Sequence, residues 1–149
     1  IPVNLYEFSS IIEKFKLENK RMPTFEDLLS GKGINYIYCF LTNLKKSSFT
    51  NREILLNTKD PNCLKTKELL LYLLAVFLRN MVLVWGSSGG AYVSGSMINT
   101  LLLDLNEKEF RKNFENSPKM KEFLSKTPLF VVLTKNLGLR GALNLVLNS

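Results

Sequence analysis

The fold of this chain is decided by the stretch Gly86-Ser-Ser-Gly-Gly-Ala-Tyr-Val-Ser-Gly-Ser-Met-Ile98. Glycines stand on both sides of the apolar run Ala91-Tyr-Val93, which predicts a buried strand, and a helical pattern over 97–103 follows directly. Glycine has no Cβ, so the backbone can turn tightly there and approach a ligand closely. Amides at a strand-to-helix turn also favour anions such as phosphate. Taken alone, the glycines favour a tight turn that packs a helix on a sheet over a phosphate site.

The part of the chain before this stretch is predicted to be helical. Leu5, Phe8, Ile12 and Phe15 recur at the spacing of one apolar helix face. A short helix through Leu29 follows. Its expected cap is Thr24 with Asp27, and Gly31 and Gly33 are expected to end it. Further helices are predicted over 34–44, over 54–57 with Asn51 as the cap, and over 64–84 behind Asp60-Pro61.

The part after this stretch alternates helix and strand. A helix through Phe114 is expected, and Asn106 together with Glu109 forms its expected cap. Another helix is expected to begin at Ser117-Pro118, with Ser117 as its cap. The β-branched run over 129–133 predicts a strand covered on both faces. A closing helix is predicted whose inner face is formed by Leu139, Ala142, Leu143 and Val146. Two short strands are too few for a self-sufficient sheet.

Four segments in a fixed order carry a family likeness. They are Leu28-Leu-Ser-Gly-Lys-Gly-Ile34, Asn80-Met-Val-Leu-Val-Trp-Gly86 with the residues through Gly95, Phe110-Arg-Lys-Asn-Phe114 with Lys119, and Thr127-Pro128 through Ala142. In these segments the chain resembles the C-terminal half of the bacterial glucokinases, the ATP-dependent hexose kinases of the actin-like superfamily. The likeness runs over nearly the whole chain.

The resemblance implies an α/β fold. The expected architecture is the C-terminal lobe of an actin-like ATPase (ribonuclease H-like) kinase, helix-rich with a small sheet, and residues 1–149 form one such lobe. In the family this lobe takes further strands from sequence that precedes it, so a missing partner segment is expected. The implied reaction transfers the γ-phosphoryl group of ATP, with Mg²⁺, to the 6-hydroxyl of glucose, which is the first step of glycolysis.

The resemblance also implies site residues. Glu18 aligns, after a one-residue insertion, with a family glutamate that binds a glucose hydroxyl; the alternative is a solvated charge on a helix. The nucleotide-binding residues implied are Gly31, Gly33, Gly89, Gly90 and Gly95, for which turns and caps are the alternative. The family's catalytic aspartate and its sugar-binding histidine motif lie upstream of Ile1. No catalytic or metal-binding residue is therefore expected here, and the chain alone is expected to be inactive.

The chain departs from the family pattern at three places, and two of them, Ser96 and Leu78-Arg79, bear on the nucleotide pocket. Lys32 replaces a proline, Ser96 replaces a glycine, and Leu78-Arg79 replaces small residues. Bulk near Asn80 or Ser96 would crowd an adenosine. The changes at Ser96 and at Leu78-Arg79 favour the alternative function, a truncated, non-catalytic nucleotide-binding or interaction module.

Composition limits the remaining classes of function. The 149 residues carry a formal net charge of +7, contain no histidine and contain two cysteines, Cys39 and Cys63. The absence of histidine excludes Ser-His-Asp and Cys-His catalysis within these residues, and the cysteine spacing matches no metal motif. Lysines alternate with acidic residues, so no nucleic-acid partner is expected. The expected partners are glucose, ATP, the missing N-terminal half and, by resemblance, a second copy in a homodimer.

The run over 69–85 is apolar enough to require comparison with a membrane span. Arg79 and Asn80 interrupt it, and a spanning helix tolerates a central arginine poorly. A buried helix of a soluble core is predicted instead, with no membrane partner and a cytoplasmic location. Trp85, Phe110 and Phe114 are expected in that core. The first residues form no signal peptide and include no initiator methionine, so a processed product or a fragment is also expected.

Overall fold

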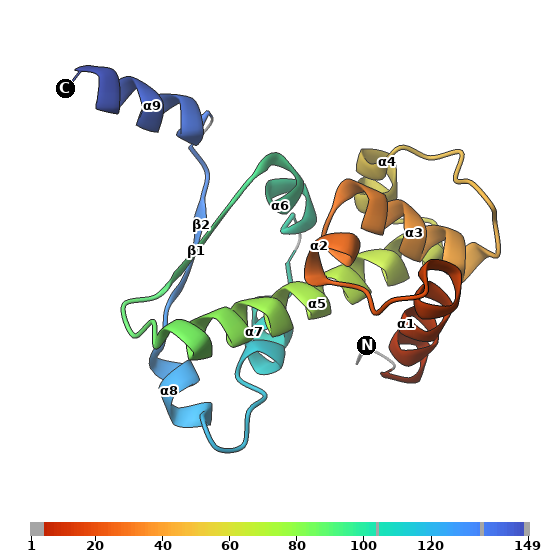
Figure 1. Cartoon of the computed structure of the whole chain (residues 1–149), viewed down its shortest axis with the longest axis horizontal. Helices are drawn as coiled ribbons and strands as arrows, with labels where there is room; N and C mark the ends of the chain where they lie inside the picture. The colour runs from red at the N-terminus through yellow and green to blue at the C-terminus, as the bar shows by residue number, and fades with distance from the viewer. Residues whose placement is uncertain (1–4, 104, 135, 148–149) are drawn as a thin grey trace.

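The computed structural model describes residues 5–103, 105–134 and 136–147 of the chain (Figure 1). Helices dominate, and two strands form a small parallel sheet. The first five helices are α1 (Leu5–Asn19), α2 (Phe25–Leu28), α3 (Gly31–Thr42), α4 (Asn51–Leu56) and α5 (Pro61–Trp85). They are followed by β1 (Ala91–Ser94), α6 (Ser96–Leu101), α7 (Glu107–Phe114), α8 (Lys121–Lys126), β2 (Leu129–Val132) and α9 (Leu137–Leu147).

Helix α5 is the central element of the fold. It lies against α3 and α4 near its start and against α7 farther along (Figure 1). The residues that it buries include Leu69, Leu73 and Val82, each at most 3% exposed. By length and composition alone, α5 is the one described helix that could cross a membrane. Its packing matches the prediction of a buried core helix.

Local capping explains where most helices begin. Thr24 and Asp27 form the predicted capping box of α2, and Asp60 caps α5, with Pro61 in the first turn. The prediction of Asn51 as the cap of α4 is wrong, because Thr50 accepts from the Glu53 amide and leaves Asn51 as the first helical residue.

Two other predicted helix boundaries are also wrong. Gly31 and Gly33 do not separate two helices, because Ser30 caps α3 and places both glycines in its first turn. The Ser117-Pro118 pair does not start a helix either. Ser117 accepts a hydrogen bond from the Met120 amide within a turn, and α8 begins only at Lys121.

The two strands pair in parallel, with Ala91 opposite Leu129 and Tyr92 opposite Phe130. Ala91, Val93 and Leu129 contact the core. On the other face the rings of Tyr92 and Phe130 stack with centroids 4.8 Å apart and are 69% and 42% exposed. The predictions of a buried first strand and of a second strand covered on both faces are therefore wrong for these residues, since no described element covers the outer face.

Helix α9 exists as predicted, but none of its described residues is buried. Figure 1 shows it beyond the end of β2, away from the other helices. Leu139 and Val146 are at least 70% exposed. The predicted inner face is thus an open apolar surface. Trp85, expected in the core, is also exposed, whereas Phe110 and Phe114 are core residues as predicted.

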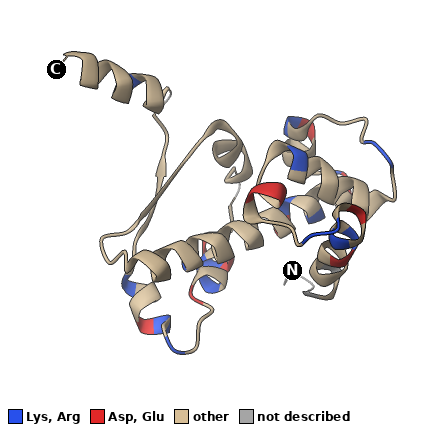
Figure 2. Cartoon of the chain, in the orientation of Figure 1, with Lys and Arg blue, Asp and Glu red and all other residues tan. Residues whose placement is uncertain are grey.

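Two arginines tie the second half of the chain together. Arg79 of α5 donates to the carbonyls of Asn113 and Asn116 at the end of α7. Arg111 of α7 donates in turn to the Leu124, Ser125 and Thr127 carbonyls at the end of α8. Cations at helix C-termini satisfy carbonyls that lack intrahelical partners. These contacts set where β2 begins. Elsewhere lysines and arginines alternate with acidic residues, as predicted, while α9 and the strands are almost free of charge (Figure 2).

Candidate functional site

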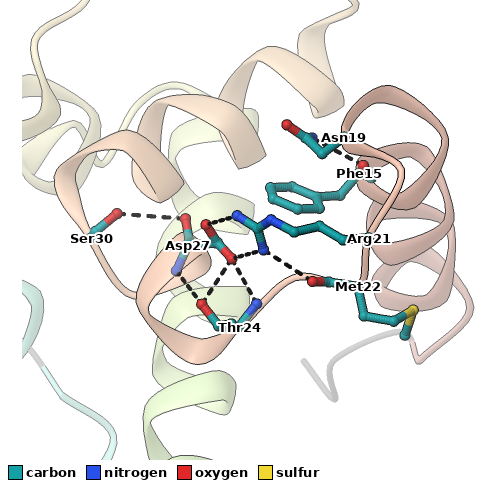
Figure 3. A network of polar contacts seen from close by, with 7 residues as sticks. All are labelled: Phe15, Asn19, Arg21, Met22, Thr24, Asp27 and Ser30. Atoms are coloured by element: carbon teal, nitrogen blue, oxygen red, sulfur yellow. Dashed lines mark hydrogen bonds and ion pairs between the residues drawn. The ribbon is translucent and has the colours of Figure 1, made fainter.

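The polar network between α1 and α2 surrounds Asp27 (Figure 3). Arg21 donates to both Asp27 carboxylate oxygens, at 2.6 and 2.7 Å. The Thr24 amide and hydroxyl each donate to Oδ2 at 2.8 Å. The bond from the Arg21 guanidinium and then those from Thr24 hold the pKa of Asp27 well below its usual range. The network fixes the segment that follows α1.

Aromatic rings connect this network to Glu18. The Arg21 guanidinium lies 5.2 Å from the centroid of the Phe15 ring, and Phe15 meets the edge of Tyr36 at 5.4 Å. The Tyr36 hydroxyl donates to Glu18 Oε2 at 2.9 Å. Burial first, and then the bond to the Glu18 carboxylate, raise the pKa of Tyr36. The other oxygen of Glu18, Oε1, lies 3.9 Å from Lys14 Nζ. Glu18 is thus exposed yet held in place, unlike a fully solvated charge.

A hollow opens beside Tyr36, between the start of α3, the loop after α3 and the start of α4. The residues that line it include Gly31, Lys32, Asn35, Tyr36, Lys45 and Asn51. Two lysines and two amides with no carboxylate among the lining residues suit an anion. They do not suit Mg²⁺, which prefers carboxylate oxygens. No group of three or more His, Cys, Asp or Glu side chains gathers into a metal site in the described part of the chain.

The two glycines of α3 differ in what surrounds them. A Cβ on Gly31 would meet the end of the Asn51 side chain at 2.8 Å, and Gly31 itself lines the hollow. A Cβ on Gly33 would lie 2.1 Å from the Leu28 carbonyl oxygen and 2.6 Å from that of Asp27. Gly33 is buried and faces the α2 backbone. Its lack of a side chain is required for the contact between α2 and α3.

The glycines around β1 lie away from the hollow. Gly89 and Gly90 belong to the turn after α5, at the end of α5 opposite to α3 and α4 (Figure 1). Gly90 has φ of 117°, and a Cβ there would meet the Phe130 ring and the Pro128 carbonyl at 2.9 Å. Gly95 has φ of 130° and precedes α6. Backbone geometry therefore requires glycine at 90 and 95.

The turn before β1 directs several of its amides inward. The Ser87 amide donates to the Val82 carbonyl. The Ser88 amide donates to the Gly86 carbonyl, and the Gly90 amide donates to the Ser87 carbonyl. The Ala91 amide donates to the Pro128 carbonyl at 3.0 Å. Amides engaged in this way are not available to cradle a phosphate. A Cβ on Gly86 or on Gly89 would meet nothing within 4 Å, so both of these glycines have open surroundings in this turn.

The structure brings together only part of the predicted site. Glu18 and Gly31 share one surface through Tyr36, and Gly33 lies behind that surface. Gly89, Gly90 and Gly95 lie elsewhere. Sequence reasoning did not identify Tyr36, Lys45 or Asn51, which reach the surface from α3, the following loop and the first residue of α4. The one local signal was Asn43, whose left-handed conformation ends α3 and redirects the chain.

The departures at positions 78 and 79 also lie outside the hollow. Leu78 is 7% exposed in the core, and Arg79 is held by the Asn113 and Asn116 carbonyls. Ser96 is the first residue of α6, and nearby Asn99 Oδ1 is buried without a hydrogen-bond partner in the described chain. Leu78 and Arg79 are thus structural, while α6 retains one unsatisfied polar atom.

Comparison with known proteins gives a consistent result. The Glucokinase family profile matches residues 6–149. A glucokinase from Colwellia psychrerythraea is 29% identical over 143 residues, which cover 89% of this chain and 43% of that protein. A glucokinase from Helicobacter pylori is 32% identical over 129 residues, and the match covers 78% of this chain and 38% of that protein. A solved glucokinase structure from an Antarctic psychrotroph superposes with a TM-score of 0.77 at 21% identity, covering 95% of this chain and 45% of that one.

The fold is therefore that of a helix-rich α/β protein with a small parallel sheet, similar to part of a glucokinase. The chain belongs to the Glucokinase family. It spans less than half the length of these relatives.

Proposed function

We propose that these residues form the C-terminal lobe of a glucokinase that transfers the γ-phosphoryl group of ATP to the 6-hydroxyl of glucose. The lobe supplies the nucleotide side of the cleft. The observation that carries the proposal is the hollow beside Tyr36, where Lys32 and Lys45 face a space bordered by Gly31. Ammonium groups with no acidic neighbour in the lining suit the phosphates of a nucleotide.

Glu18 is proposed as a glucose contact. Its carboxylate is exposed and already accepts one hydrogen bond, from Tyr36. A carboxylate has about four acceptor positions, so sugar hydroxyls still find partners there. Because Tyr36 also borders the hollow, a sugar held by Glu18 would lie on the same surface as the nucleotide phosphates.

The five predicted nucleotide-binding glycines do not all have the same proposed role. Gly31 borders the proposed phosphate region and fits a nucleotide-facing backbone, whereas Gly89 lies in an open turn at the opposite end of α5 from that region. Gly33, Gly90 and Gly95 act on the nucleotide indirectly, by fixing α3 and the two ends of β1. No lining residue suits Mg²⁺. In this proposal the metal is held by the phosphates and by groups outside this lobe.

The remaining parts of the enzyme lie outside these residues in this proposal. An N-terminal half supplies the catalytic base and most of the glucose site, so residues 1–149 alone catalyse nothing. That half also covers the outer sheet face and α9, whose apolar residues are largely exposed in the described chain. The enzyme is proposed to act in the cytoplasm, as a homodimer and without nucleic-acid or membrane partners.

A second candidate is a non-catalytic nucleotide-binding or interaction module. The exposed Tyr92–Phe130 pair and the uncovered α9 favour it, because an apolar surface of this kind suits a protein partner. The two functions differ in glucose chemistry, because only the first phosphorylates glucose.

Calorimetric titration with ATP tests the nucleotide site. Lys32→Gln and Lys45→Gln are each expected to weaken ATP binding about five-fold or more, because each removes a charged hydrogen-bond donor. Lys126→Gln, at an exposed position of α8, is the control and should leave ATP affinity unchanged. Equal ATP affinity in all four proteins would place the nucleotide elsewhere.

A further inference from the structure

We propose that the hollow between α7 and α8 binds a small anion that carries at least two phosphate groups. The hollow has a volume of about 660 Å³ and is formed by α7, the connection that follows it and the first residue of α8. Figure 1 shows this connection well away from α3 and α4, which border the hollow beside Tyr36. The site is therefore separate from the nucleotide and glucose contacts proposed above.

Three lysines give the hollow its positive charge. Lys108 and Lys112 belong to α7, and Lys121 is the first residue of α8. All three are exposed, and in the described chain none of their ammonium groups has an ion pair. Residues four positions apart share one face of a helix, so Lys108 and Lys112 reach the hollow together. Lys121 reaches it from the other helix.

Among the described lining residues Glu115 is the one carboxylate, and it is already neutralised. Arg111 Nε donates to Glu115 Oε1 at 2.6 Å, and the rest of this guanidinium donates to carbonyls at the end of α8. The Arg111–Glu115 pair therefore adds no net charge, while the three ammonium groups remain. A phosphate monoester carries about −1.5 to −2 charge at pH 7, so two such groups match the three lysines.

Neutral donors border the hollow in fixed positions. They belong to Asn113, Asn116 and Ser117. Arg79 of α5 holds the carbonyls of both asparagines, and the Met120 amide donates to the Ser117 carbonyl at 3.1 Å. Amide and hydroxyl groups donate hydrogen bonds to phosphate oxygens. Because the connection is tied down before a ligand arrives, little ordering of the backbone opposes binding.

The charges around the hollow favour a small anion over a nucleic-acid strand. Glu107 precedes Lys108, and Glu122 follows Lys121. Figure 2 shows basic and acidic segments next to each other along α7 and α8. A single strand is held along a continuous positive groove. Here the unpaired positive charge is confined to the hollow itself.

Calorimetric titration with inorganic pyrophosphate tests the site on the polypeptide that carries these residues in the cell. The background is the double variant Lys32→Gln, Lys45→Gln, which lacks the cations proposed for the nucleotide phosphates. The added changes Lys108→Gln, Lys112→Gln and Lys121→Gln should together weaken pyrophosphate binding about twenty-fold or more, since each removes a charged donor. Pyrophosphate should raise the melting temperature of the background protein but not that of the protein without the three lysines.

Lys119→Gln is the matched control. Lys119 is exposed in the same connection but does not line the hollow. Its replacement should change pyrophosphate affinity by less than about two-fold, because only screened, long-range attraction is lost. Inorganic phosphate should bind about ten-fold more weakly than pyrophosphate, because one phosphate group meets fewer of the lysines.

Equal pyrophosphate affinity with and without the three lysines would overturn the proposal. So would a loss with Lys119→Gln as large as that of the triple change, since it would show a general effect of charge. Citrate that binds as tightly as pyrophosphate would overturn the assignment to phosphate, and an oligonucleotide that binds more tightly would make this a nucleic-acid surface instead. Failure of the nucleotide proposal would leave this test unaffected, because the background already lacks both lysines of that site.

Discussion

Gly33 lies against Leu28 so closely that a Cβ at position 33 would stand 2.1 Å from the Leu28 carbonyl oxygen. The first turn of α3 and the end of α2 therefore touch backbone to backbone. Gly33 was expected to bind a nucleotide, but the packing of α3 on α2 itself requires a glycine at this position. This relationship separates the glycines needed for folding from those open to a ligand.

Gly33→Ala is expected to destabilise the protein by about 3 kcal/mol, because the Leu28 backbone has to move to admit one methyl group. Chemical denaturation measures the change. Gly89→Ala is the control, since a Cβ there meets nothing within 4 Å and its φ is not one that favours glycine. Its free energy of unfolding should stay within about 0.5 kcal/mol of wild type. Equal losses in both variants would contradict the packing role of Gly33.

Asp27 should make the protein sensitive to acid. Its pKa in the folded state is lowered, chiefly by Arg21 and then by Thr24, from a usual value of 3.8. A lowered pKa contributes stability that is complete above the unfolded-state value and is lost as the pH falls below it. The melting temperature of wild type should therefore fall more steeply below about pH 4 than that of Asp27→Asn. Parallel profiles for the two proteins between pH 5 and pH 2 would contradict this prediction.

Arg111 should matter more than its position on a surface helix indicates. Replacing it with methionine leaves the Leu124, Ser125 and Thr127 carbonyls without their charged donor. The expected loss is about 2 kcal/mol, with faster amide hydrogen exchange in β2. Lys126→Met removes only an exposed ion pair with Glu122 and should cost about 0.5 kcal/mol or less. An unchanged exchange rate in β2 would show that Arg111 does not hold that strand.

Leu143→Asp tests whether α9 has a partner. Leu143 is 56% exposed, so the substitution should leave the unfolding free energy of residues 1–149 within about 0.5 kcal/mol of wild type. In a complete kinase the same substitution should lower the melting temperature, because a charge would enter an apolar interface. Leu17→Asp, at an 81% exposed position of α1, should be neutral in both proteins. Identical behaviour of the two variants in the complete kinase would mean that nothing covers α9 there.

Local chemistry made the helices predictable. The capping residues Thr24 and Asp60 act on amides two or three positions away, so the sequence alone contains the relevant partners. The start of α3 was missed because Gly31 and Gly33 were expected to end a helix. The Ser30 hydroxyl instead accepts a hydrogen bond from the Gly33 amide and begins α3. These errors shift boundaries but do not change the type of element.

Burial depends on partners that a local pattern does not contain. The outer face of β2 and the apolar face of α9 have the composition of covered surfaces, yet Phe130 and Leu139 are exposed in the described chain. The site shows the same limit. Glu18 was proposed from an aligned position, whereas Tyr36 lies beside it, and Lys45 near Tyr36, only through the path of α3 and the loop after it.

The proposed kinase activity is tested most directly by an assay of the polypeptide that carries these residues in the cell. It is incubated with glucose, ATP and Mg²⁺, and the sugar product is identified. We expect ATP-dependent formation of glucose 6-phosphate by that polypeptide and none by residues 1–149 alone. ATP binding without any glucose phosphorylation by the native polypeptide would contradict the kinase assignment and favour the non-catalytic module.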